Sequence, residues 1–395
     1  MCGIVGYIGK REAYPILIKG LERLEYRGYD SAGVALLQDG AFSVYKKKGK
    51  VADLKKSIKK IPEGKIGIAH TRWATHGVPS DKNAHPQLSN SGEIAIVHNG
   101  IIENYLAIKK LLLRKGYKFY SDTDTEVLAN LIEDIKKNAK VSLDEAVRLA
   151  LLKVVGAYAI LVLSKSEPGS MVVAKVGSPA AIGVGGKKTN PEFFVASDAT
   201  PIVEYTDKII FLEDHEIGVI KSGRLVIKTT QNKKRSPIVQ KIEMKVEELE
   251  KGGYAHFMQK EIFEQPDALR NTIRGRLVYS LGNVKFGGLE KFKKELKKIK
   301  NITTVAMGTA RFTGLIGEYA LEELAGIPTK VEYGSEFAYR KSALGKDTAL
   351  LAISQSGETA DTLNAVKEAK RRGMHTFGIV NVIGSSIARR PRRRS

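Results

Sequence analysis

The residues best suited to chemistry begin with Cys2, the only cysteine among the 395 residues of the chain. One cysteine can form neither an internal disulfide nor a site with several thiolate ligands, so this thiol is either inert packing or reactive. Removal of Met1 would place the thiol and a free α-amine on one residue. An α-amine has a pKa of about 7.7–8.0 and can take up the thiol proton near neutral pH, directly or through water. The pattern therefore allows a combined nucleophile and base, and the alternative is a small apolar residue that starts a strand.

The segment "HTRWATHG" contains groups that would help such a thiol attack an amide. Arg72 is a planar cation suited to bidentate binding of a carboxylate, and its alternative is a surface ion pair. Trp73 could act as a lid, and Thr75 and His76 as hydrogen-bonding neighbours. These residue types indicate a site for a small anionic ligand.

Two further segments supply an oxyanion site and an anion. "VHNGIIEN" ends a predicted strand at Asn99 and Gly100, where a side-chain amide and a backbone N–H can point at one oxygen. "SDTDTE" offers Asp124 to a ligand ammonium group. Asn-Gly is also a common turn, and "SDTDTE" before an apolar run is also a good helix start. Together with Cys2 and Arg72, the groups fit one ligand, an α-amino acid with a side-chain amide.

A second candidate site lies near the end of the chain, in "TALLAISQSGETADTLNAVKEA". Its hydroxyl and amide side chains fall between a predicted strand and a predicted helix: Ser354, Gln355, Ser356 and Thr359. Hydroxyls and backbone N–H groups at a helix N-terminus suit a phosphate. The alternative is an ordinary helix start with Ser and Thr caps.

The formal net charge of +22 favours a lysine-rich solvated surface over a nucleic-acid site. The basic end "ARRPRRRS" lacks interleaved aromatic residues and is expected to be a disordered tail. In "LEKFKKELKKIKN", apolar residues recur at helical spacing, which predicts an amphipathic helix on a core. No apolar run approaches the roughly 18 residues of a membrane span, and no secretory leader is recognisable. The absence of a span and a leader predicts a cytoplasmic protein. The single cysteine allows no multi-thiolate metal site, and we expect neither a metal nor a cofactor.

The pattern of short apolar runs predicts an α/β fold in two blocks. Residues 1–230 combine strand-like runs with helical patterns near 11–25, 103–115, 124–138 and 142–153, which predicts a layered α and β domain. The polar residues 231–252 are the expected linker. In residues 253–395, single strands alternate with helices, which predicts a parallel sheet.

The first block resembles the class II glutamine amidotransferase domain, an N-terminal-nucleophile hydrolase. "MCGIVGYIG", "LEYRGYDSAG", "HTRWATHG", "NAHP", "VHNGIIEN" and "DTDTE" occur in the order and approximate spacing of that family. The resemblance implies a four-layer αββα fold in which Cys2 attacks the side-chain carbonyl of L-glutamine, forms a thioester and releases ammonia. It also implies that Arg72 and Asp124 hold the ligand, that Asn99 and Gly100 form the oxyanion hole, and that Arg27 and Trp73 shape the pocket.

The second block resembles the phosphosugar-binding domain of the glutamine–fructose-6-phosphate aminotransferase family. The resemblance rests on the Ser354–Thr359 loop and on "HFMQKEIFEQP", "LAGIPTKVEYGSEFAYRKS" and "IVNVIGSS". It implies fructose 6-phosphate as ammonia acceptor and a homodimer, with no nucleic-acid or membrane partner. In "AMGTARFTG", Thr309 matches the family pattern, but Ala310 replaces a hydroxyl expected near the sugar phosphate.

The end of the chain departs further from that family. The pattern stops in "RRPRRRS" after four strands, so we expect an incomplete first sugar-isomerase unit and a chain that retains only glutamine hydrolysis. A phosphosugar- or nucleic-acid-binding protein with a relic amidotransferase domain is the alternative.

Overall fold

The structure, a computed structural model, describes residues 2–25, 28–187, 189–241, 252–278, 280, 282–286, 288–341, 347–382 and 385–389. The chain divides into two compact units, Met1–Leu249 and Glu250–Ser395, and each is described by itself. Arg27 and the basic tail from residue 390 onward, both singled out in the sequence, lie outside the described residues.

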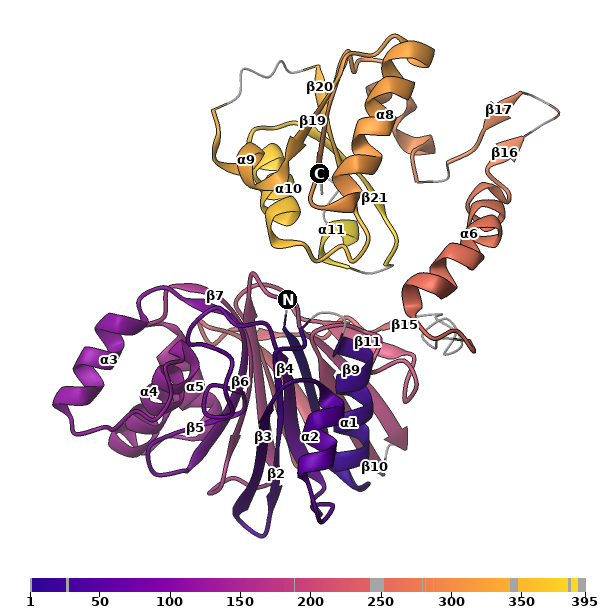
Figure 1. Ribbon diagram of the computed structural model, residues 1–395. Helices are drawn as coiled ribbons and strands as arrows, with labels where there is room; N and C mark the ends of the chain where they lie inside the picture. The colour runs from indigo at the N-terminus through magenta and orange to yellow at the C-terminus, as the bar shows by residue number, and fades with distance from the viewer. Residues whose placement is uncertain are drawn as a thin grey trace. The chain divides into compact units, whose positions relative to one another are not determined.

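Two antiparallel sheets packed face to face form the centre of the first unit (Figure 1). The first sheet contains, in spatial order, β15 (Gln240–Lys241), β11 (Lys208–Phe211), β9 (Ala181–Lys187), β10 (Asn190–Ala196), β1 (Gly3–Ile8), β4 (Ile66–Arg72), β2 (Ser31–Gln38) and β3 (Ala41–Lys48). The second contains β14 (Lys234–Arg235), β13 (Arg224–Thr229), β12 (Glu216–Lys221), β8 (Ser170–Val176), β7 (Gly156–Ser164), β6 (Ile94–Ile102) and β5 (Gln87–Leu88).

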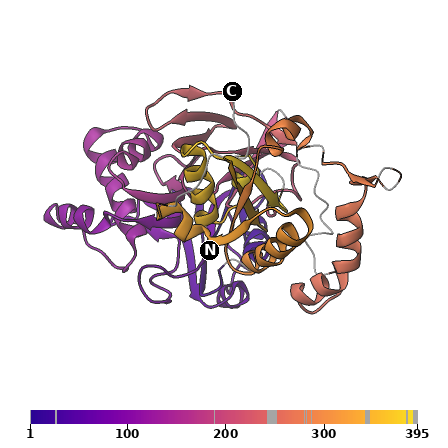
Figure 2. The ribbon, with the colours of Figure 1, turned by 90° about the horizontal axis from the view of Figure 1, so that it is seen from above.

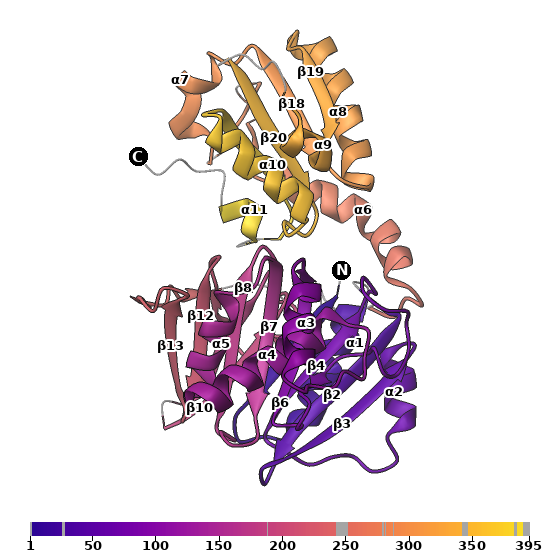
Figure 3. The same cartoon turned by 90° about the vertical axis from the view of Figure 1, so that its left-hand side faces the viewer.

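Helices cover the outer face of each sheet. The first sheet is covered by α1 (Ala13–Leu24) and α2 (Val51–Ser57), and the second by α3 (Tyr105–Arg114), α4 (Asp124–Ala139) and α5 (Leu143–Leu151) (Figure 3). The result is the four-layer αββα arrangement that the family resemblance implies.

Three apolar clusters hold these layers together. One joins α1 and α2 to the first sheet and contains Leu17 and Leu21, which are fully buried. A second joins α4 and α5 to the second sheet, and a third fills the space between the sheets, with Ile68 of the first sheet and Val97 of the second. Strands of this central pair are apolar on both faces because both faces are covered.

The polar stretch expected as a linker begins inside the first unit. Its residues 234–235 pair with β13, and residues 240–241 pair with β11, at the edges of the two sheets. Residues 242–251 lie outside the described part of the chain.

A four-stranded parallel sheet forms the core of the second unit. Its spatial order is β19 (Thr329–Tyr333), β18 (Asn301–Ala306), β20 (Thr348–Ser354) and β21 (His375–Val380). The connecting helices are α8 (Thr309–Ala325), α9 (Gly334–Tyr339) and α10 (Ala360–Arg371), with α8 on one face and α10 on the other (Figures 2 and 3). This is the parallel sheet that the alternating sequence pattern predicts.

The strand order places two loops together. The chain leaves β18 toward β19 and leaves β20 toward β21, in opposite directions across the sheet. The loops that follow β18 and β20 therefore meet at the carboxyl ends of neighbouring strands, where open α/β sheets bind their ligands.

The prediction of one amphipathic helix over "LEKFKKELKKIKN" is wrong, because the helical turns found there are much shorter. The segment forms the 3₁₀ turn Glu290–Phe292 followed by the single turn α7 (Lys293–Leu296), and no residue of α7 is buried. Its apolar residues are too few to compensate for the repulsion among closely spaced lysines. The remaining elements are α6 (Phe257–Ile273), the short hairpin β16 (Leu277–Val278) and β17 (Asn283–Val284), and α11 (Ser386–Arg389).

Among the described residues, no helix combines the length and apolarity needed to cross a membrane.

Candidate active site

Cys2 lies at the start of the first unit's central strand. The residue after it, Gly3, opens β1 and pairs with Thr71 of β4. The Cys2 Sγ atom accepts a hydrogen bond from Trp73 N at 3.1 Å and lies 3.4 Å from Trp73 O. Burial raises the pKa of the Cys2 thiol, and the Trp73 contact opposes that shift. The thiol is therefore a protonated group held at the end of β4.

Asn99 reaches Cys2 from the other sheet. It lies on β6, and its Nδ2 atom donates to the main-chain oxygen of Cys2 at 3.0 Å. Gly100 follows it with φ 129°. A Cβ atom on Gly100 would lie 2.0 Å from Ala157 O, so only glycine fits this position. The facing sheet thus places Asn99 beside Cys2, with Gly100 as the next residue of β6.

Arg72 is buried at the end of β4, with 3% of its surface exposed. Its Nη2 donates to the main-chain oxygens of His76 and Gly77. Its Nη1 is buried and has no hydrogen-bond partner. A buried guanidinium with an unused donor is suited to an anionic ligand, because an unpaired buried charge is costly.

Asp124 is the first residue of α4 and is 4% exposed. The helix start itself is capped by Thr123, whose side chain accepts from Glu126 N. The capping interpretation therefore holds for Thr123. Asp124 Oδ2 instead accepts from Ile102 N at 2.8 Å, which ties α4 to the end of β6. A carboxylate in this position can accept a further hydrogen bond from a ligand ammonium group.

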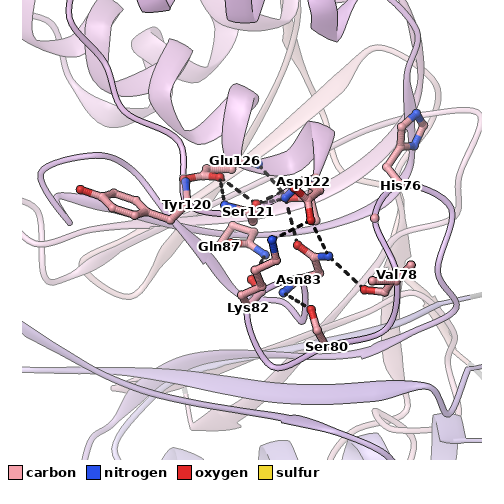
Figure 4. Close-up of polar contacts among 12 residues, drawn as sticks. His76, Val78, Ser80, Lys82, Asn83, Gln87, Tyr120, Ser121, Asp122 and Glu126 are labelled. Atoms are coloured by element: carbon pink, nitrogen blue, oxygen red, sulfur yellow. Dashed lines mark hydrogen bonds and ion pairs between the residues drawn. The ribbon is translucent and has the colours of Figure 1, made fainter.

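The loop around Val78 and Asn83 is braced against Asp122, which lies just before α4 (Figure 4). Asn83 is fully buried; its Nδ2 donates to Val78 O and Asp122 Oδ2, and its Oδ1 accepts from Asp122 N. Lys82 forms an ion pair of 2.9 Å with Asp122. These bonds hold the loop that provides the main-chain partners of Arg72.

The remaining residues predicted for this site have less direct contacts. Trp73 is 51% exposed and packs edge-on against Tyr29, with ring centroids 5.8 Å apart. Thr75 is exposed. The His76 ring packs against Tyr105, and its Nδ1 has no hydrogen-bond partner.

In the second unit, residues 354–359 join β20 to α10, and we call this segment the hydroxyl loop because it carries three hydroxyl side chains. Ser354 is buried, and its Oγ accepts from Gly357 N at 3.0 Å and lies 3.4 Å from Thr359 Oγ1. Ser356 Oγ accepts from Glu358 N at 3.2 Å, and Gln355 is exposed. These hydrogen bonds lie within the loop itself. At the start of α10 the N-cap residue Thr359 forms no side-chain capping hydrogen bond, so the cap expected of an ordinary helix start is not found there.

Thr309 begins α8 and follows β18, which is the neighbour of β20. It lies exposed at the carboxyl edge of the same sheet as the hydroxyl loop. Ala310 beside it offers no hydroxyl.

Two family models match different parts of the chain. A family model described as "Glutamine amidotransferase domain" matches residues 55–266, more than half of the chain. The chain belongs to the glutamine amidotransferase domain family. A second model, described as "SIS domain", matches residues 295–394.

Curated relatives of this amidotransferase chain are named glutamine–fructose-6-phosphate aminotransferase (isomerizing). The protein from Bacteroides thetaiotaomicron is 54% identical, over 98% of this chain and 63% of that protein. The protein from Chlorobaculum tepidum is 51% identical, with the same coverage of both chains. The chain therefore spans about 63% of the length of the curated relatives it matches.

A solved structure confirms the fold of the amidotransferase chain. Glutamine phosphoribosylpyrophosphate amidotransferase from B. subtilis, complexed with ADP and GMP, matches with a TM-score of 0.52 and 21% identity. The match covers 96% of this chain and 81% of that one.

Two polar residues of the amidotransferase site were missed by the sequence analysis. Asp30 accepts from Ala74 N and Ser31 Oγ, and its own N–H donates to Arg72 O, so it fixes the chain around Trp73. His70, two residues before Arg72 on β4, hydrogen-bonds Asn99 Oδ1 at 2.9 Å. The period of two along a strand could have indicated His70, because it places His70 and Arg72 on one face.

Proposed function

We propose that the first unit hydrolyses the side-chain amide of L-glutamine with Cys2 as nucleophile. The observation that carries the proposal is the meeting of Cys2 with the Asn99 amide, 3.0 Å from the Cys2 carbonyl oxygen, beside a buried arginine with an unused donor. A nucleophile, an oxyanion donor and an anion site then lie within one ligand's reach.

The reaction follows from these positions. Sγ bonds to the amide carbon, and the negative charge that develops on the amide oxygen is stabilised by Asn99 Nδ2 and the Gly100 N–H. The C–N bond breaks, and the thiol proton leaves with ammonia. Water then hydrolyses the thioester, which releases glutamate and restores the thiol. Because burial raises the pKa of the Cys2 thiol, the attack of Sγ on the amide carbon needs a base to remove the thiol proton. The α-amine of Cys2 after loss of Met1 is suited to this role.

Two measurements test the proposal directly. Intact mass should show that Met1 is absent, and incubation with glutamine should release glutamate and ammonia in equal amounts. Retention of Met1 by a protein that still hydrolyses glutamine would refute the α-amine as the base. Absence of glutamate release would refute the proposed function.

Arg72→Ala should mainly weaken glutamine binding. We propose that the unpartnered Nη1 holds the α-carboxylate of glutamine in ground state and transition state alike. Loss of such a uniform interaction should raise KM by roughly 10-fold or more, as expected for a charge-assisted pair, and leave kcat nearly unchanged. Steady-state glutamate release measures both constants. The exposed Arg224→Ala is the matched control and should change neither, and a fall of kcat at constant KM in Arg72→Ala would contradict this role.

For the second unit, we propose a sugar-phosphate site at Thr309, Ser354, Gln355, Ser356 and Thr359, with fructose 6-phosphate as the acceptor of ammonia. The proposal is supported by the neighbouring positions of the β18 and β20 loops and by the names of the curated relatives. Association of two chains into a homodimer also stays a prediction, and sedimentation measurements can test it.

A polypeptide of these 395 residues should release glutamate without making glucosamine 6-phosphate. Hydroxyls and a helix N-terminus can bind a phosphate, but moving a proton between C1 and C2 of the sugar requires a positioned general base. Mass spectrometry after incubation with glutamine and fructose 6-phosphate should detect no amino sugar, and stoichiometric product would contradict this expectation. Binding of fructose 6-phosphate, followed by calorimetry, should be weak, lost in Ser356→Ala with Thr359→Ala and kept in the exposed Thr272→Ala.

A further inference from the structure

His70 lies fully buried between the two sheets of the first unit. It comes from β4, and its Nε2 atom lies 2.9 Å from Asn99 Oδ1 and 3.1 Å from His98 O, both on β6. The histidine thus joins the strand that carries Arg72 to the strand that carries Asn99.

These contacts determine the orientation of the Asn99 amide. A main-chain carbonyl such as His98 O can only accept, so His70 Nε2 must carry the hydrogen. The Asn99 atom that faces this N–H must then be the acceptor Oδ1. Consequently Nδ2 faces away from His70, toward Cys2, where it donates to Cys2 O.

We propose that His70 is a positioning residue, which holds the Asn99 amide with its NH2 group toward Cys2 and the reacting oxygen. The inference rests on the proposed function of Cys2 and Asn99 in glutamine hydrolysis. The two orientations of an asparagine amide have almost the same shape, so their hydrogen-bond partners decide between them. The reverse orientation would place Oδ1 against the developing oxyanion and would repel it.

The surroundings keep His70 a neutral donor. Burial lowers its pKa to about 3, with Arg72 and His98 acting in the same direction and the Asn99 bond opposing. The His85 ring packs against it with centroids 4.4 Å apart, and His70 Nδ1 has no hydrogen-bond partner. The Nε2–H donor is therefore present across the pH range in which an enzyme of this kind would be assayed.

His70→Phe should lower kcat for glutamine hydrolysis roughly 10²-fold, the size of effect seen when one oxyanion donor is lost, with KM within about 2-fold of the parent. His70→Gln, which can place an amide N–H near the position of Nε2, should recover much of kcat. Thr71→Val is the matched control: Thr71 is the next residue of β4 and equally buried, and its hydroxyl has no hydrogen-bond partner. This variant should keep the parent kcat.

Two further measurements separate positioning from a general loss of structure. Alkylation of Cys2 by iodoacetamide passes through no oxyanion, so its rate should be unchanged in His70→Phe. In an Asn99→Ala background, adding His70→Phe should lower kcat only slightly further, because His70 acts through Asn99. A parent-like kcat in His70→Phe, or an equal further loss in the Asn99→Ala background, would overturn the proposal.

NMR of 15N-histidine protein tests the contact without turnover. His70 should show a protonated Nε2 that does not titrate between about pH 5 and 9, and His70→Phe should shift the Asn99 side-chain amide resonances. Titration of His70 in that range would overturn the proposal. A parent that releases no glutamate would refute the proposed function instead, and the NMR result would still decide the His70–Asn99 contact.

Discussion

Cys2→Ala is expected to abolish glutamine hydrolysis while leaving the fold of the first unit intact. The hydrogen bonds found for the Cys2 thiol all go to main-chain atoms of Trp73, so removal of the sulfur should disturb little of the packing. Without a nucleophile no thioester forms, and glutamate release should fall by at least roughly 10⁴-fold, as for loss of other covalent nucleophiles. Thermal unfolding should show a melting temperature close to that of the parent.

Alkylation provides a matched test of the same thiol. Because the chain has no other cysteine, one equivalent of iodoacetamide should abolish hydrolysis and add one label, which mass spectrometry places on residue 2. Cys2→Ala should take up no label. A Cys2→Ala variant that hydrolyses glutamine as fast as the parent would refute the nucleophile.

The pH profile should follow the base that activates this thiol. Since burial raises the pKa of Cys2, the thiol is protonated at neutral pH and its proton must be removed. An α-amine with a pKa of about 7.7–8.0 becomes competent as the pH rises, so kcat/KM should increase between about pH 6 and 8. A profile that falls over this range would exclude the α-amine as base.

The second large effect is expected for Asn99→Ala. Its Nδ2 is the side-chain donor placed beside Cys2, and an oxyanion interaction is made mainly in the transition state. Loss of one such donor should lower kcat roughly 10²–10³-fold with little change in KM. Steady-state kinetics of glutamate release give both constants.

Asn104→Ala is the matched control for Asn99→Ala. Asn104 follows the same strand, and its side chain bonds Lys153 O and Val155 N, away from Cys2. Its loss should lower stability by about 1–2 kcal/mol and leave kcat near that of the parent. If Asn99→Ala raised KM at constant kcat, as expected for Arg72→Ala, the two roles would have been assigned wrongly.

Much of the secondary structure could be predicted from local sequence. The helices near 124–138 and 142–153 are found at Asp124–Ala139 and Leu143–Leu151, because an apolar face at helical spacing and local caps define them. The strands β9 and β10 were not predicted. β9 contains three glycines in "AIGVGGK", and its conformation depends on pairing with β10 and β11.

The candidate site divides in the same way. The sequence alone determined which residue types were available: a lone cysteine at position 2, an Asn-Gly pair, an arginine after a predicted strand and an aspartate at a predicted helix start. Only the tertiary structure decided that β1 pairs with β4, that β6 faces them from the other sheet, and that His70 orients the Asn99 amide. Residues 70 and 99 are 29 positions apart and lie in different sheets, so their contact depends on how the sheets pack, and local propensity carries no information about that packing.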